Sequence, residues 1–162
     1  MITPHNVEEW LRQQRGDQHW DFWEGCSGTG RLSLHFKQAG SRVIFPIDFR
    51  YGWDIGFVPH QQLLEKVRDA LKPKMWFWAP DCLPWGQSGN RIDPQLRALQ
   101  RASQIPSLEW IFKQNKFQVT HGNIYVNENP VGSDIFRHSP LEKPGPRRFQ
   151  DRPDRTPVPL RS

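Results

Sequence analysis

The chain has 162 residues, the size of one domain, with 36% hydrophobic and 24% charged residues. No apolar run approaches the ~20 residues of a membrane-spanning helix, and no secretory leader pattern opens the sequence. Two cysteines, Cys26 and Cys82, are too few for a metal cluster or a disulfide framework. These features exclude membrane-spanning and disulfide-rich secreted proteins, and favour an intracellular protein without a metal centre.

The net charge of +5 is unevenly distributed along the chain. Residues 139–162 hold six Lys/Arg, three Asp/Glu and six prolines, so +3 of the charge lies in this segment. The body is therefore only mildly basic, which is a weak indicator of nucleic-acid binding. We expect an N-terminal helix and linker over 1–17, an α/β domain over 18–138, and a disordered Pro/Arg-rich tail over 139–162.

Helices and strands are predicted to alternate. In chain order we expect a helix over 7–14, a strand over 19–24, a helix over 32–39, a strand over 41–48, a helix over 59–71, a strand over 75–79, a helix over 95–115, and short extended segments at 118–119 and 124–127. Asp93 and Pro94 have the pattern of an N-cap followed by a first helical residue, and Pro106 predicts a break or kink. The alternation predicts a Rossmann-like, doubly wound, mostly parallel sheet with flanking helices.

The residues just after each predicted strand are the functional candidates, because ligands of open α/β sheets bind beyond the carboxyl ends of the strands. Glycines at 25, 28 and 30 follow the first strand and let the backbone approach a ligand closely. Asp48 ends the second strand, where an acid can accept hydrogen bonds from two ribose hydroxyls. The pattern indicates a nucleoside-type cofactor; the alternative is a tight turn followed by a solvated acid.

Cys82 and Glu128 form the second candidate group. Cys82 follows the third predicted strand between Pro80 and Pro84, a rigid and partly exposed place of the kind a thiolate nucleophile requires. Glu128 follows the last strand and is expected at the same rim of the sheet. A thiol beside a carboxyl group that exchanges protons is a catalytic pairing. The alternatives are a buried structural cysteine and a glutamate that caps a loop amide.

Three motifs at these strand ends together resemble the cytosine-C5 DNA methyltransferase family of the S-adenosylmethionine-dependent methyltransferase superfamily. They read Glu24-Gly25-Cys26-Ser27-Gly28-Thr29-Gly30-Arg31-Leu32-Ser33 followed by Phe36, Ala39 and Gly40; then Ala79-Pro80-Asp81-Cys82-Leu83-Pro84-Trp85-Gly86 with Gly89; and Glu128-Asn129-Pro130. The resemblance covers about residues 20–132. The chain departs from the family where Cys26 stands for a phenylalanine and Asp81 for the second proline of the catalytic loop.

The resemblance implies S-adenosyl-L-methionine as cofactor and methylation of cytosine C5 in DNA or RNA. The cofactor residues that it implies are Glu24, Cys26, Gly28, Gly30, Asp48, Asp54, Ile55 and Pro80. Among these, Asp48 would hold the ribose, and Asp54 with Ile55 would contact the adenine. Cys82 would attack C6 of a flipped-out cytosine, since the target atom is unreachable inside a duplex, and Glu128 would hydrogen-bond the base at N3 and the amino group.

Two other functions stay open from the sequence. The segment 47–54 resembles short methyltransferase-like segments of mobile-element polyproteins, which favours an inactive module, a fragment or remnant, that binds a partner or nucleic acid. The chain also ends where the family's target-recognition region would begin, so an active enzyme would need a second chain to supply that region. An amino-methylating enzyme using Asp81 with Pro84 and Trp85 is a further alternative, although Cys82 and Leu83 interrupt its motif.

Overall fold

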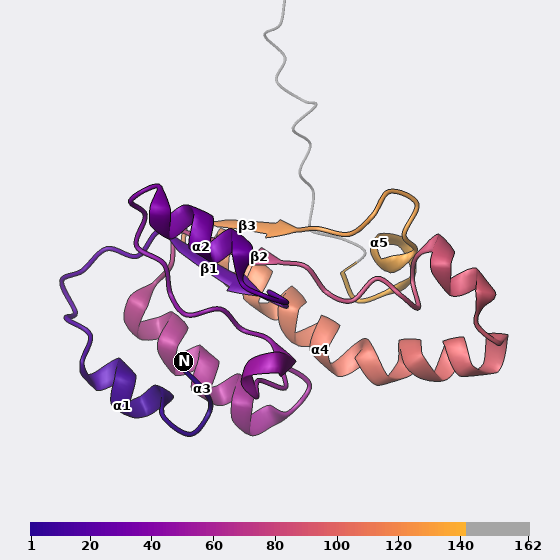
Figure 1. Cartoon of the computed structure of the whole chain (residues 1–162), viewed down its shortest axis with the longest axis horizontal. Helices are drawn as coiled ribbons and strands as arrows, with labels where there is room; N and C mark the ends of the chain where they lie inside the picture. The colour runs from indigo at the N-terminus through magenta and orange to yellow at the C-terminus, as the bar shows by residue number, and fades with distance from the viewer. Residues whose placement is uncertain (142–162) are drawn as a thin grey trace, which may run out of the picture.

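The computed structural model describes residues 1–141 and has a mixed α/β fold (Figure 1). In chain order its elements are α1 (Val7–Arg12), β1 (Phe22–Gly25), α2 (Arg31–Gln38), the 3-10 helix η1 (Phe49–Tyr51), α3 (Val58–Leu71), β2 (Met75–Trp78), the 3-10 helix η2 (Gln87–Arg91), α4 (Pro94–Thr120), β3 (Ile124–Asn127) and α5 (Ile135–His138). The predicted α/β class, with a parallel sheet and flanking helices, is confirmed.

The three strands form one parallel sheet in the order β1-β2-β3. In its register Gly25 lies beside Trp78, and Trp78 lies beside Asn127. All three strands therefore end at the same edge, where the loops that follow them are neighbours. The long connections that parallel pairing requires contain α2 and α3 between the first two strands, and α4 between the last two.

The prediction of a regular strand over 41–48 is wrong. This segment forms only two isolated parallel bridges to β1, at Val43 and at Ile47. Between them Pro46 has no N–H to donate, which interrupts the ladder. The segment still runs alongside β1, on the side opposite β2, so that Asp48 reaches the same edge of the sheet as the ends of the strands.

Alternate residues of β1 face opposite layers of the molecule. Phe22 stacks on Phe36 of α2, with ring centroids 4.0 Å apart, whereas Trp23 stacks on Trp76 of β2 at 4.2 Å. Trp76 in turn meets Trp110 of α4 edge to face at 5.9 Å. Figure 1 shows the corresponding layers, with α2 on one face of the sheet and α3 and α4 on the other.

Tryptophan dominates the core. Seven of the eight tryptophans are buried, and the eighth, Trp10, packs against the same cluster. The ring of Trp78 stacks on Trp76 at 4.7 Å and lies directly against the backbone of Gly25. A Cβ placed on Gly25 would come within 2.0 Å of the Trp78 ring, so this position admits only glycine without displacing the ring.

We therefore expect Gly25→Ala to lower the free energy of unfolding by about 3 kcal/mol, the upper end of the usual cost of overpacking a core. The ring of Trp78 has nowhere to move, because it is fully buried between its aromatic neighbours. Chemical denaturation measures the change. Gly16→Ala is the matched control, since nothing lies within 4 Å of the added methyl. Equal stability of the two variants would contradict the packing described.

The 27-residue helix α4 starts as the sequence predicts and continues further than expected. Asp93 Oδ1 accepts hydrogen bonds from the N–H groups of Gln95 and Leu96 at 3.0 and 3.1 Å, which confirms the predicted N-cap. The helix runs through Pro106 without a break, and Figure 1 shows it bending along its length. This bend gives α4 one half that lies under the sheet and one half that projects beyond it.

The extended segment predicted at 118–119 is wrong, because α4 continues to Thr120. Gln118 is fully buried there, and its side-chain amide donates to the carbonyls of Pro73 and Ile124, both at 3.0 Å. These two bonds join the end of α4 to the starts of β2 and β3. A tertiary contact therefore extends the helix beyond the range that its sequence pattern indicates.

Both ends of the described chain pack against the body. In α1, Val7 is buried and Glu8 forms an ion pair with Lys66 of α3 at 2.6 Å. At the other end Ser139 and Leu141 are buried, and the rest of the predicted tail lies outside the described residues. Within residues 1–141, none of the helices combines the length and apolar character needed to span a membrane.

Candidate functional site

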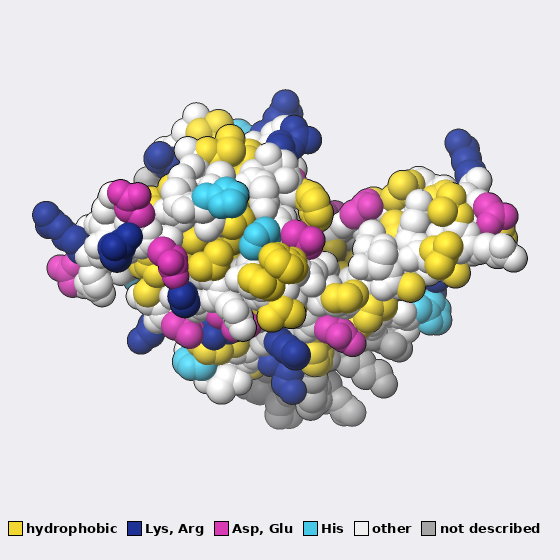
Figure 2. Space-filling model, turned by 90° about the horizontal axis from the view of Figure 1, so that it is seen from below, with side chains coloured by type: hydrophobic (Ala, Val, Ile, Leu, Met, Phe, Trp, Pro, Cys, Tyr) yellow, Lys and Arg dark blue, Asp and Glu magenta, His cyan; other side chains and the backbone are white. Residues whose placement is uncertain are grey.

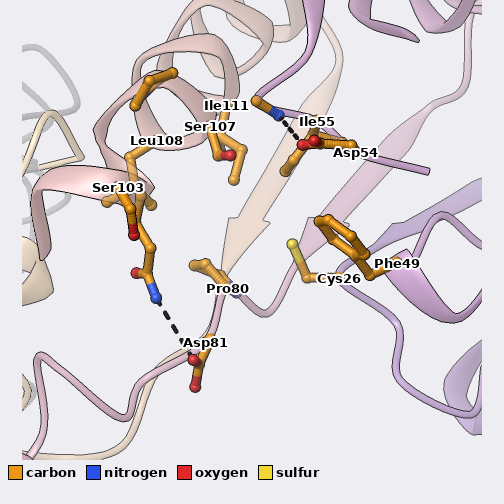
Figure 3. Close-up of a pocket in the computed structure, with 13 residues that line it drawn as sticks. Cys26, Phe49, Asp54, Ile55, Pro80, Asp81, Ser103, Ser107, Leu108 and Ile111 are labelled. Atoms are coloured by element: carbon orange, nitrogen blue, oxygen red, sulfur yellow. Dashed lines mark hydrogen bonds between the residues drawn. The ribbon is translucent and has the colours of Figure 1, made fainter. Parts of the chain in front are cut away.

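A cavity of about 520 Å³ lies at the carboxyl edge of the sheet (Figure 3). Its walls come from Cys26 after β1, from residues between 49 and 56, from the start of the loop after β2, and from the face of α4 between 103 and 111. Its volume is within the ~300–1,000 Å³ of small-molecule sites. Four of the eight predicted cofactor residues line it: Cys26, Asp54, Ile55 and Pro80.

The predicted residues Gly28, Gly30 and Asp48 lie outside the lining and hold the loop in place. The two glycines have φ angles of +56° and +68°, in the left-handed region that favours glycine. The N–H of Gly28 donates to Asp48 Oδ2 at 2.8 Å, and Asp48 Oδ1 accepts from the N–H of Arg50 at 2.9 Å. The carboxylate thus ties the glycine-rich turn to the start of η1.

Glu24, the remaining predicted cofactor residue, also has a partner within the protein. Its buried carboxylate accepts hydrogen bonds from the N–H and the hydroxyl of Ser33, at 2.8 and 2.5 Å. Ser33 lies in the first turn of α2, where N–H groups have no partner within the helix. Glu24 therefore caps α2 and fixes the helix against the end of β1.

Cys26 contributes the sulfur atom that Figure 3 shows directed into the cavity. Its φ of +54° is unusual for a residue with a side chain, so the surrounding loop holds it there. Burial of the thiol, together with the negative charges of Asp48 and Asp81, raises its pKa from 9.0 to about 12. The thiol is therefore protonated at neutral pH, and Cys26 acts as a wall of the cavity rather than a nucleophile.

We expect slow alkylation of Cys26 in a Cys82→Ser variant at pH 8. A pKa of about 12 leaves about a thousandfold less thiolate than the ordinary value, and the higher intrinsic reactivity of such a thiolate compensates only in part. Iodoacetamide labelling followed by mass spectrometry measures the rate, which should rise more than about tenfold when the variant is unfolded in urea. Equal rates in the folded and unfolded protein would contradict the pKa shift.

Phe49 contributes an aromatic ring to the cavity that the sequence analysis did not single out. It follows Asp48 directly, lines the cavity, and is 76% exposed although it is a large apolar side chain. Asp54 and Ile55 lie next to it in Figure 3, and Asp54 Oδ1 accepts from the N–H of Gly56 at 2.8 Å. An exposed ring beside a carboxylate can stack on one face of a flat heterocycle while the carboxylate accepts its hydrogen bonds.

Cys82 lies beside the cavity and does not line it. Its side chain is half-buried, and its carbonyl accepts hydrogen bonds from the N–H groups of Trp85 and Gly86, at 3.0 and 2.7 Å. Within the same loop, Asp81 Oδ1 accepts from the N–H of Leu83 at 3.0 Å. The loop that carries the thiol is therefore a tight turn with most of its polar backbone groups satisfied internally.

Two arginines of α4 fix this turn from outside. Arg97 and Arg101 both donate from Nε to the carbonyl of Pro84, at 2.8 and 2.7 Å. Arg101 also covers the buried ring of Trp85 at 4.8 Å and donates to Asp134 at 2.9 Å. This hydrogen bond lowers the pKa of the Asp134 carboxyl below its ordinary value. Both arginines therefore hold the loop that carries Cys82.

Glu128 lies on the loop next to that of Cys82, as the sequence predicted for neighbouring parallel strands. Its N–H donates to the carbonyl of Trp78 at 2.8 Å, and its side chain is exposed. The amide of Asn129 donates to the carbonyl of Pro80 at 2.9 Å and joins the two loops. Neither the thiol nor this carboxylate lies among the residues that line the cavity.

The wall that α4 contributes was missed by the sequence analysis. Gln104 links this helix to the loop after β2: its Oε1 accepts from Trp85 Nε1 at 2.7 Å, and its Nε2 lies 3.5 Å from Asp81 Oδ2. Ser103 and Ser107 lie one turn apart on the same face of the helix, opposite Phe49 in Figure 3. The spacing of positions 103, 104 and 107 could have indicated this wall, since these positions share one face of a helix.

No family model, curated protein or solved structure matches the chain significantly. In the part of the chain that the structure describes, no three His, Cys, Asp or Glu side chains are grouped so as to hold a metal ion. The chemistry of this site is therefore argued from its residues and their geometry.

Proposed function

We propose that the cavity binds S-adenosyl-L-methionine and that the chain is a Rossmann-like methyltransferase domain acting on cytosine C5 in DNA or RNA. The observation that carries this proposal is the position of the cavity. It lies beyond the carboxyl ends of parallel strands, and Cys26, Asp54, Ile55 and Pro80, which the resemblance implies as cofactor residues, line it.

The path of the chain supports a ligand site at this place. From β1 the chain passes to the bridging segment at Val43 and Ile47, on one side of the strand, and then returns to β2 on the other side. The connection thus reverses direction next to β1, and ligands of doubly wound sheets bind at such a reversal. The cavity lies there, between Cys26 and Pro80.

The lining fits an adenosyl group with a positively charged sulfur. Phe49 offers an exposed ring for a base, Asp54 a carboxylate that accepts hydrogen bonds, and Ile55 and Pro80 apolar contacts. Among the described residues, no lysine, arginine or histidine lines the cavity, so its walls offer no cationic partner for a phosphate group. When bound, S-adenosylmethionine supplies an electrophilic methyl group.

In this proposal Cys82 and Glu128 act on the base. Cys82 would add as thiolate to C6 of an extruded cytosine, and C5 would take the methyl group from the sulfonium, which leaves as a thioether. Loss of the C5 proton to solvent would then expel the thiolate and restore the ring. Glu128 hydrogen-bonds the base at N3 and the amino group. The bond from Asn129 to Pro80 supports the pairing, since it holds the loops of the two residues together at one edge of the sheet.

A second candidate function, a cofactor-binding module without methyl transfer, is favoured by two observations. The thiol of Cys82 and the carboxylate of Glu128 both lie outside the lining of the cavity. Charged side chains of both signs are also interspersed on the face in Figure 2, without a continuous basic surface for a nucleic-acid backbone. Such a module binds the cofactor and forms no covalent bond to cytosine.

Binding of S-adenosylmethionine is tested by calorimetry with the wild-type chain and Phe49→Ala. We expect a dissociation constant below about 100 μM for the wild type, and binding at least about tenfold weaker for the variant, because one stacking face is lost. Phe136→Ala is the matched control, since this partly exposed ring on α5 does not line the cavity. Absence of heat at millimolar ligand, or equal binding by Phe49→Ala, would count against the proposal.

A further inference from the structure

Among the described residues, the charged side chains that line the cavity are both negative. Asp54 and Asp81 line it, and the carboxylate of Asp48 lies behind the loop that carries Cys26. His60 does not line the cavity, and its Nδ1 accepts the N–H of Asp54 at 3.1 Å. In the part of the chain that the structure describes, the walls thus combine two carboxylates with no cationic side chain.

The two carboxylates lie at different ends of the cavity. Figure 3 shows Asp54 beside Phe49 and Ile55, and Asp81 at the far end below Pro80, where Gln104 approaches it. The contact from Gln104 is long, at 3.5 Å, so Asp81 Oδ2 keeps most of its capacity to accept a hydrogen bond. Asp81 is exposed at the mouth of the cavity and its charge is available to a ligand.

The pKa of the Cys26 thiol depends on the electrostatic potential inside the cavity. Besides burial, the charges of Asp48 and Asp81 raise its pKa, which means that a negative charge on this sulfur is disfavoured. The two carboxylates favour a positive charge near the same position, whereas burial, the largest cause of the shift, disfavours a charge of either sign. The positions of the two carboxylates and the raised pKa of the thiol therefore both indicate a negative potential in the cavity.

We infer that the cavity selects a nucleoside ligand that carries a positive charge on its side chain, a sulfonium rather than a thioether, and that Asp81 is the residue that determines this selectivity. The inference rests on the proposed function. Asp81 stands where the resembling family has an uncharged proline, so the preference belongs to this chain. Phosphorylated nucleotides are disfavoured by the same two carboxylates.

Three ligands of graded charge test the inference in calorimetric titrations of the full chain. S-adenosylmethionine has one net positive charge, S-adenosylhomocysteine is neutral overall, and adenosine monophosphate is negative. We expect the sulfonium to bind at least about tenfold more tightly than the thioether, and the nucleotide to bind most weakly. Asp81→Asn should weaken binding of the sulfonium about tenfold while binding of the thioether changes less than about twofold.

Asp17→Asn is the matched control, because it removes the same charge from an exposed turn outside the cavity and should leave all three affinities unchanged. If sulfonium and thioether bind equally, or if Asp81→Asn weakens both to the same extent, the inference is overturned while the proposed cofactor site stands. If none of the adenosyl ligands binds, the proposed function and the inference both fail.

Discussion

A Cys82→Ser variant will form no covalent adduct with DNA that contains 5-fluorocytosine, whereas the wild-type chain will form one in the presence of S-adenosylmethionine. The reason is chemical: after the thiolate has added to C6 and C5 has been methylated, fluorine does not leave as a proton does, so the bond to sulfur persists. Serine at position 82 is a much weaker nucleophile and leaves no adduct. Denaturing gel electrophoresis and mass spectrometry detect the product.

Leu83→Ala is the matched control for this experiment, because it changes the exposed neighbour of Cys82 in the same turn. It should retain the adduct, and DNA with ordinary cytosine should give none. An adduct that persists in Cys82→Ser would remove this cysteine from the mechanism. Absence of an adduct with the wild type, when calorimetry shows that the cofactor binds, would favour the module without methyl transfer.

Replacing Trp85 by alanine should cost about 3–5 kcal/mol of unfolding free energy, the usual cost of truncating a buried tryptophan. The ring is 2% exposed, its N–H donates to Gln104, and Arg101 covers its face. Its loss leaves a void under the loop of Cys82 and an unpartnered carbonyl on Gln104. Chemical denaturation measures the effect.

Leu99→Ala on α4 is the comparison for Trp85→Ala, since this side chain is 68% exposed. Its unfolding free energy should lie within about 0.5 kcal/mol of the wild type. Trp85→Phe should fall between the two, because it keeps most of the ring and loses the hydrogen bond to Gln104. A Trp85→Ala variant as stable as Leu99→Ala would contradict the role of this ring as the support of the loop.

The sequence predicted those parts of the fold that a local pattern determines. Apolar runs located β1, β2 and β3, and the Asp93–Pro94 pair located the start of α4. The segment 41–48 has the same apolar character as a strand, but one proline interrupts its pairing. The far end of α4 depends on contacts of Gln118 with distant carbonyls, which no local pattern contains.

The candidate site was predicted in part, for a similar reason. Cys26, Asp54, Ile55 and Pro80 follow from motifs at the ends of strands and line the cavity. Glu24 and Asp48 occur in the same motifs, yet their carboxylates hold Ser33 and Gly28. Whether a carboxylate faces a ligand or a backbone N–H is decided by loop conformation. Phe49 was missed because a single exposed ring has no periodicity.

The most direct test of the central claim is a crystal structure of the chain with S-adenosylmethionine. The account predicts electron density for the adenosyl group in the cavity lined by Phe49, Asp54, Ile55 and Pro80, with the positively charged end near Asp81. Density for the ligand on another surface, or an empty cavity at a ligand concentration that saturates binding in solution, would contradict it.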